Sequence, residues 1–233
     1  MHRSGTSFLA RALNISGLYL GSIESLTLTE SNADESNPRG HWESREFIRL
    51  GKETRVFNKY FYHNVPEKII IPEKLGNEIK NAAEKLMQPN SVAAGFKDPH
   101  CLLYLDSWYK YLPKSSVIVG IFRHPLKVAE SLKIRDGRHY EESLLIWKLH
   151  NVELLKSLEK HGGFLLNFDW SKEKLLSSIY SIIEKLSLVK TDLSEWYTER
   201  LFRSDKTYDS EYPLSDEIKE IYSKLIKISE KTN

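Results

Sequence analysis

The sequence has little cysteine, no segment rich in linker residues and no long apolar run. Its single cysteine, Cys101, excludes an intrachain disulfide and fits a reducing compartment. The 11 glycines and 8 prolines are scattered, so no Gly- or Pro-rich segment divides the chain. The clearest apolar stretch, around 117–122, falls far short of the roughly 18 residues that a membrane helix requires. We therefore expect a cytoplasmic protein without a transmembrane segment.

The chain also lacks a strong excess of charge of either sign. Its 34 Lys and Arg residues nearly balance 32 Asp and Glu residues, which gives a formal net charge of +2. This balance by itself argues for neither a nucleic-acid nor a membrane surface; we expect no nucleic-acid partner, and any anion site must be local. Apolar residues make up 40% of the chain, which suits a globular core. We interpret residues 1–233 as one domain.

Apolar periodicity predicts helices that alternate with short buried strands. The clearest strand is 116–122 (SVIVGIF), a continuous apolar run typical of a parallel strand covered on both faces. Weaker strand signals lie at 91–95 and 164–168, and the polar stretch 22–40 is expected to be a long surface loop. The alternation indicates an α/β protein with parallel strands. Helical patterns cover seven segments: 5–15, 41–59, 75–87, 143–158, 174–188, 215–228 and a segment that begins at Pro125.

A phosphate-binding pattern lies at the amino end of the chain. Arg3, Ser4, Gly5, Thr6 and Ser7 combine a cation, a glycine and hydroxyls where the first helix is expected to begin. The start of a helix offers unpaired N–H groups and a positive dipole to an anion. The pattern resembles a Walker A loop but lacks the Gly-Lys-[Ser/Thr] ending. It predicts a phosphate or sulfate site, and the alternative is a helix-capping serine beside a solvated arginine.

A second phosphate signal follows the clearest strand. Arg123 comes directly after that strand, and Ser131 lies eight residues later on the next expected helix. Both can face the carboxyl end of the sheet, where open α/β folds bind ligands. A Mg-dependent nucleotide hydrolase would be expected to carry a metal-binding aspartate at the end of this strand. The arginine found there predicts direct phosphate binding without a metal ion.

Together the two motifs resemble the 5′- and 3′-phosphate-binding segments of sulfotransferases that use 3′-phosphoadenosine 5′-phosphosulfate (PAPS). HRSGTS at 2–7 is similar to the family's Lys/Arg-Ser-Gly-Thr-Thr/Ser segment, and IFRHPLKVAESL at 121–132 is similar to its arginine and serine eight apart. Segments 37–43, 96–100 and 145–151 look like parts of bacterial and glycan-modifying members. The resemblance implies a three-layer α/β/α fold with a central parallel sheet, like that of P-loop nucleoside-triphosphate hydrolases.

The resemblance also implies an activity, the metal-independent transfer of a sulfuryl group from PAPS to a hydroxyl acceptor. Segment 3–7 would bind the 5′-phosphosulfate, with Arg3 at the bridging oxygen. Arg123 and Ser131 would hold the 3′-phosphate, and Arg203 would reach it from a late basic loop. The likeness to glycan-modifying members favours a carbohydrate or glycan acceptor over another small molecule.

Two residues are candidates for the general base that takes the acceptor's proton. Glu43 is preferred because glutamate-using relatives, such as heparan sulfate 3-O-sulfotransferases, carry one after the first loop and helix, although the spacing here is longer. His100 is the alternative, since cytosolic small-molecule sulfotransferases place a histidine at a similar distance before the 3′-phosphate arginine. Lys97 matches a second catalytic lysine and would stabilise the sulfuryl group. Otherwise Glu43 is a solvated helix acid, and Lys97 forms an ion pair with Asp98 or another acid.

One part of the family's pattern has no counterpart in the sequence. The phosphate loop normally follows a buried strand, yet here it begins two residues after Met1. We therefore expect the first strand to be missing from this chain. Two other functions stay open: a non-catalytic or truncated nucleotide-binding protein of the same fold, and a P-loop kinase or nucleotide hydrolase, which the absent Gly-Lys-[Ser/Thr] disfavours.

Overall fold

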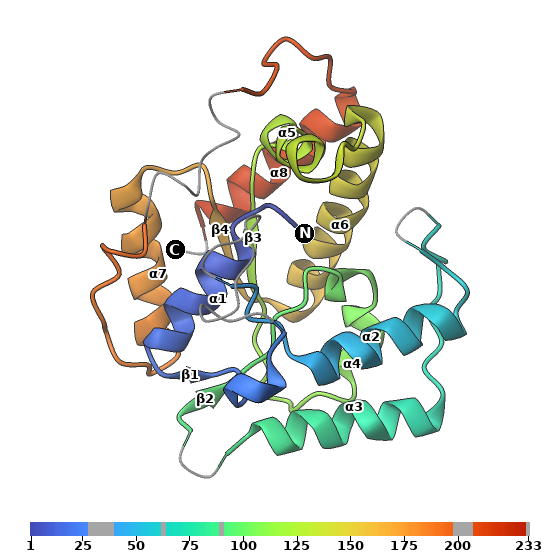
Figure 1. Ribbon diagram of the computed structural model, residues 1–233, viewed down its shortest axis with the longest axis vertical. Helices are drawn as coiled ribbons and strands as arrows, with labels where there is room; N and C mark the ends of the chain where they lie inside the picture. The colour runs from blue at the N-terminus through green and yellow to red at the C-terminus, as the bar shows by residue number, and fades with distance from the viewer. Residues whose placement is uncertain (28–39, 62–63, 89–90, 198–206, 232–233) are drawn as a thin grey trace. The chain divides into compact units, whose positions relative to one another are not determined.

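The computed structural model describes residues 1–27, 40–61, 64–88, 91–197 and 207–231 (Figure 1). Within them the chain is an α/β protein in which helices alternate with short parallel strands. The residues form two compact units. Unit 1 consists of Met1–Thr6, Val117–Ile182 and Asp192–Asn233, and unit 2 consists of Ser7–Ser116 and Ile183–Thr191.

Unit 1 contains two parallel strands, β3 (Val119–Phe122) and β4 (Phe164–Asn167). Their register places Phe122 opposite Asn167, so both strands end at the same edge. The last three residues of each strand are buried, as the apolar runs in the sequence predict. Residues that directly follow the two strands are therefore brought close together.

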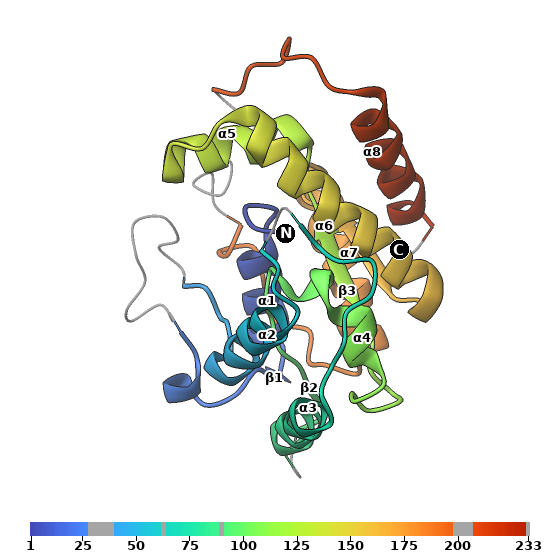
Figure 2. The same cartoon turned by 90° about the vertical axis from the view of Figure 1, so that its right-hand side faces the viewer.

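The part of the chain that includes unit 1 also contains four helices besides these two strands. The first, α5 (Pro125–Asp136), begins at a proline, which suits the first turn because that position has no intrahelical partner for an N–H. The others are α6 (Tyr140–His161), α7 (Lys172–Lys185), which ends in unit 2, and α8 (Asp216–Ser229). Figure 2 shows α6 beside α5 and α8, and α8 also packs against β4. Ser215 caps α8, since its side chain accepts a hydrogen bond from the backbone N–H of Ile218.

Unit 2 has a second parallel pair, β1 and β2, which spans only two residues in each strand. Its core lies between helices: the ring of Phe47 stacks on Phe96 at 4.0 Å, and the fully buried Trp108 donates a hydrogen bond from Nε1 to Thr54 Oγ1 at 3.0 Å. The elements of this unit are α1 (Thr6–Ile15), which begins at the end of unit 1, β1 (Leu18–Tyr19), η1 (Ile23–Ser25), α2 (Arg45–Phe57), α3 (Glu73–Leu86), β2 (Ala93–Ala94), η3 (Cys101–Leu103) and α4 (Leu105–Tyr109).

The seven predicted helices and three predicted strands are all present, with altered ends. The helix predicted over 41–59 begins only at Arg45, because Trp42 has a left-handed backbone (φ +58°) that a right-handed helix excludes. Residues 28–39 of the predicted loop 22–40 lie outside the described part of the chain. None of the helices in the described part is both long and apolar enough to cross a membrane.

Candidate functional site

The loop that precedes α1 has an unusual backbone. Arg3 and Gly5 are left-handed (φ +62° and +86°), whereas Ser4 between them is not. A nest is an anion-binding concavity in which left- and right-handed residues alternate and turn successive N–H groups toward one side, and the angles at residues 3–5 are compatible with one. A left-handed arginine costs roughly 1–2 kcal/mol, and such strain is concentrated at ligand sites.

Gly5 is required by its surroundings as well as by its backbone. A Cβ atom added there would lie 2.3 Å from Cδ2 of Phe168, the residue that follows β4. The loop therefore packs directly on the end of the β3–β4 pair. Because Phe168 is buried, its ring has little room to move away.

We expect Gly5→Ala to lower the free energy of unfolding by about 2–4 kcal/mol, as left-handed strain is added to overpacking. Gly137→Ala is the matched control in unit 1, since Gly137 has φ +68° but no atom within 4 Å of an added Cβ. That variant should lose only about 1 kcal/mol. Urea denaturation measures both, and equal losses would contradict the proposed contact with Phe168.

The two predicted phosphate motifs meet in unit 1. Arg3 donates a hydrogen bond from Nε to Oγ of Ser131 at 2.8 Å, although the two residues are 128 positions apart. Arg123 is 2% exposed and donates from Nη1 to the carbonyl of Arg3 at 3.5 Å. Its guanidinium also lies over the ring of Phe168, 5.3 Å from the centroid. Three of the predicted anion-binding side chains are thus neighbours.

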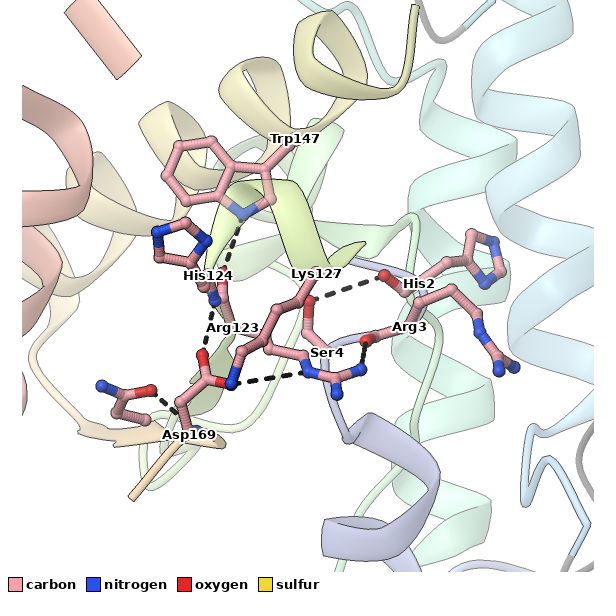
Figure 3. Close-up of polar contacts among 9 residues, drawn as sticks. His2, Arg3, Ser4, Arg123, His124, Lys127, Trp147 and Asp169 are labelled. Atoms are coloured by element: carbon pink, nitrogen blue, oxygen red, sulfur yellow. Dashed lines mark hydrogen bonds and ion pairs between the residues drawn. The ribbon is translucent and has the colours of Figure 1, made fainter. Parts of the chain in front are cut away.

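Asp169 belongs to the same cluster, and it was not among the predicted site residues (Figure 3). Its carboxylate accepts hydrogen bonds from the backbone N–H of His124 (2.6 Å) and from Nζ of Lys127 (2.9 Å), and Nε of Arg123 lies 3.6 Å from it. The sequence did hold a signal for it, namely an acid two residues after the buried strand β4. Since β3 and β4 end at the same edge, Asp169 had to lie near Arg123.

Aromatic side chains enclose this cluster from α6 and α8. Trp147 is fully buried and donates from Nε1 to the carbonyl of Arg123 at 3.0 Å (Figure 3). The ring of Tyr222 meets His124 edge to face, with centroids 5.0 Å apart. Burial raises the pKa of Tyr222 to about 12, so its hydroxyl stays neutral at physiological pH. These contacts limit the movement of the backbone around Arg123.

A second cluster lies in unit 2. Nζ of Lys97 forms an ion pair with Oε1 of Glu43 at 2.6 Å, and the two side chains are only 11% and 14% exposed. Lys97 also donates to Oγ of Ser7 (3.2 Å) and to the carbonyl of His41 (3.1 Å). Burial lowers the pKa of Lys97, and the carboxylate of Glu43 opposes that shift. Three predicted site residues therefore meet here.

Asp98 is held away from this pair by the core of unit 2. Its carboxylate accepts hydrogen bonds from the hydroxyl of Tyr104 and from the backbone N–H of His100, the latter at 2.8 Å. A Cβ atom on Gly51 would lie 2.0 Å from the Tyr104 hydroxyl, so α2 packs tightly over it. Burial raises the pKa of both Asp98 and Tyr104. Lys97 thus pairs with Glu43, while its neighbour in sequence is fixed in the core.

No family model, curated protein or solved structure matches the chain. Arg203, the predicted late contact to the 3′-phosphate, lies outside the described residues, as do residues 37–39 of the segment 37–43. Over the ranges that the structure describes, no group of three or more His, Cys, Asp or Glu side chains is arranged to hold a metal ion.

The two clusters offer different chemistry. In unit 1, Arg3, Arg123 and Lys127 lie close to one another around Asp169, and this concentration of cations suits an anion. In unit 2, a buried carboxylate and ammonium offer a proton acceptor and a charge stabiliser at contact distance. His100, the other base candidate, is also in unit 2, at the start of η3.

Proposed function

We propose that this protein is a PAPS-dependent sulfotransferase with a three-layer, P-loop-like α/β/α fold, and that it transfers a sulfuryl group to a hydroxyl of a carbohydrate or glycan. The observation that carries the proposal is the 2.8 Å contact between Arg3 and Ser131 beside the buried Arg123. Two motifs that resemble the phosphate-binding segments of one family are neighbours in space. A donor with two separate anionic groups requires two such motifs to lie close together.

The residues of unit 1 fit the donor's two anionic ends. The loop at residues 3–5 and the side chain of Arg3 suit the 5′-phosphosulfate, because backbone N–H groups and a guanidinium both donate to its oxygens. Arg123 and Ser131 suit the 3′-phosphate, since a guanidinium can bind two oxygens at once. None of these contacts requires a metal ion.

The proposal assigns the transfer step to the following residues, by the roles that the resemblance gives them. Glu43 accepts the proton of the acceptor hydroxyl as that oxygen forms a bond to sulfur, while the bond from sulfur to the 5′-phosphate oxygen breaks. Lys97 stabilises the charge on the sulfuryl oxygens, and Arg3 stabilises the leaving phosphate. The ion pair favours the charged form of Lys97. The products are a sulfate ester and 3′-phosphoadenosine 5′-phosphate (PAP).

Calorimetric titration with PAP in the presence of EDTA tests the proposal. We expect saturable binding, because the proposed contacts involve no metal. A folded sample that does not bind PAP overturns the proposal, and binding that needs Mg²⁺ and prefers ATP would indicate a P-loop kinase or hydrolase.

Transfer is then tested directly with radiolabelled PAPS and panels of glycans and phenols. Sulfation of a glycan supports the full proposal, and sulfation of phenols alone would replace the acceptor class. Binding of PAP without transfer to any acceptor would leave the non-catalytic nucleotide-binding protein as the function.

A further inference from the structure

The geometry points to a role for Asp169 as the internal counter-ion of the 3′-phosphate site, where it weakens the binding of nucleotide. This inference rests on the proposed function, because it concerns the cations that would hold the 3′-phosphate. Asp169 contacts one of them, Arg123, and through the same carboxylate it also contacts the neighbouring cation Lys127 (Figure 3).

Because this carboxylate is largely buried, its charge interacts more strongly with its neighbours than a surface charge would. The side chains of Arg123, Asp169 and Lys127 are 3%, 11% and 18% exposed. Two cations at such positions are costly unless an anion compensates them. Asp169 supplies one negative charge to both, at 3.6 Å from Nε of Arg123 and 2.9 Å from Nζ of Lys127.

Asp169 is also held in place independently of the cations. Its carboxylate accepts the His124 backbone N–H at 2.6 Å, and its own backbone N–H donates to Oδ1 of Asn167 at 2.9 Å. The residue follows β4, and His124 follows β3, so the hydrogen bond joins the ends of two paired strands. Because of these bonds the carboxylate stays beside the cations whether or not an anion is bound.

A phosphate that binds Arg123, with Lys127 nearby, therefore meets a fixed negative charge. It must share the cations with Asp169, and it is repelled by the carboxylate at short range. In the absence of phosphate the same carboxylate stabilises the fold. Asp169 thus raises the stability of the empty site and lowers its affinity for PAP, which favours release of the product after transfer.

The variant Asp169→Asn separates charge from shape, because the amide oxygen can still accept the His124 N–H. We expect it to bind PAP about tenfold more tightly and to melt at a lower temperature without ligand. Adenosine 5′-phosphate, which lacks the 3′-phosphate, should change much less in affinity. Glu173→Gln is the control, since it removes one exposed negative charge four residues away in the same unit.

Calorimetry with wild type and variants decides the inference. Unchanged or weaker PAP binding by Asp169→Asn overturns it, as does an equal gain for adenosine 5′-phosphate, whereas failure of the wild type to bind PAP overturns the proposed function instead. If Asp169→Asn does not fold, Lys127→Met is compared with Lys127→Met/Asp169→Asn, in which one buried cation is removed together with the carboxylate. The double variant should then bind PAP more tightly than Lys127→Met, and the reverse order overturns the inference.

Discussion

Replacement of Glu43 by glutamine is expected to lower the turnover number of sulfuryl transfer by about 10²- to 10⁴-fold, which is the usual contribution of a general base. The amide keeps the shape of the side chain but cannot take the acceptor's proton. PAP affinity should change little, because Glu43 is not among the residues proposed to bind the phosphates. Initial rates with radiolabelled PAPS and calorimetry with PAP measure the two effects separately.

Glu46→Gln is the matched control for this variant, since Glu46 is an exposed acid in the first turn of α2. It should retain wild-type turnover. Full activity in Glu43→Gln would exclude Glu43 as the base and transfer that role to His100, which a His100→Gln variant would then examine.

The same substitution has a second effect, through Lys97. Burial already lowers the pKa of Lys97, and Glu43 is the largest influence that opposes this shift. Without the carboxylate the pKa of Lys97 falls further, so the ammonium loses its proton at a lower pH. The residual activity of Glu43→Gln should therefore decline at a lower pH than wild-type activity on the alkaline side. A decline at the same pH in both enzymes would show that deprotonation of Lys97 does not cause the loss of activity at alkaline pH.

Arg123→Ala is expected to weaken PAP binding by about 2–3 kcal/mol, which corresponds to about 30- to 150-fold in the dissociation constant. The guanidinium is almost fully buried, and its proposed bonds to the 3′-phosphate are charge-assisted. Without Arg123, the carboxylate of Asp169 and the 3′-phosphate of the bound nucleotide also repel each other with one fewer cation beside them. Calorimetry with PAP measures the change, and circular dichroism verifies that the variant is folded.

The control for Arg123→Ala is Arg135→Ala, which removes an arginine from the last turn of α5, the helix that follows Arg123, where Arg135 pairs with Asp136. Its PAP affinity should equal that of the wild type. Adenosine 5′-phosphate provides the second comparison, because it lacks the group that Arg123 would bind. Unchanged PAP affinity in Arg123→Ala would remove Arg123 from the site.

Much of the fold could be predicted because its elements have strong local signals. The apolar run at 116–122 identifies β3, and Pro125 marks the start of α5. The pair β1 and β2 was predicted only in part, since two residues are too short to show a strand period, and Leu18–Tyr19 gave no signal. Helix ends were the weakest predictions, as Trp42 illustrates, because a single left-handed residue is invisible to periodicity.

From the sequence, site residues were predicted only where they belong to a recognised motif. Arg3, Arg123 and Ser131 were selected as phosphate ligands, and the structure places them together. Lys97 and Glu43 were selected separately, and their ion pair could not be derived from the sequence because 54 residues separate them. Asp169 was missed because no motif contains it. Its partners depend on the pairing of β3 with β4, which is a tertiary contact.

The tight packing of Gly51 against Tyr104 has a consequence for mutational tolerance. Even alanine at Gly51 would displace the Tyr104 hydroxyl, and with it the hydrogen bond to Asp98. Asp98 is the next residue after Lys97, so a displaced Asp98 would also shift the backbone that carries the Lys97 side chain. If Lys97 acts as proposed, substitutions in the interior of unit 2 are therefore restricted by its placement as well as by stability.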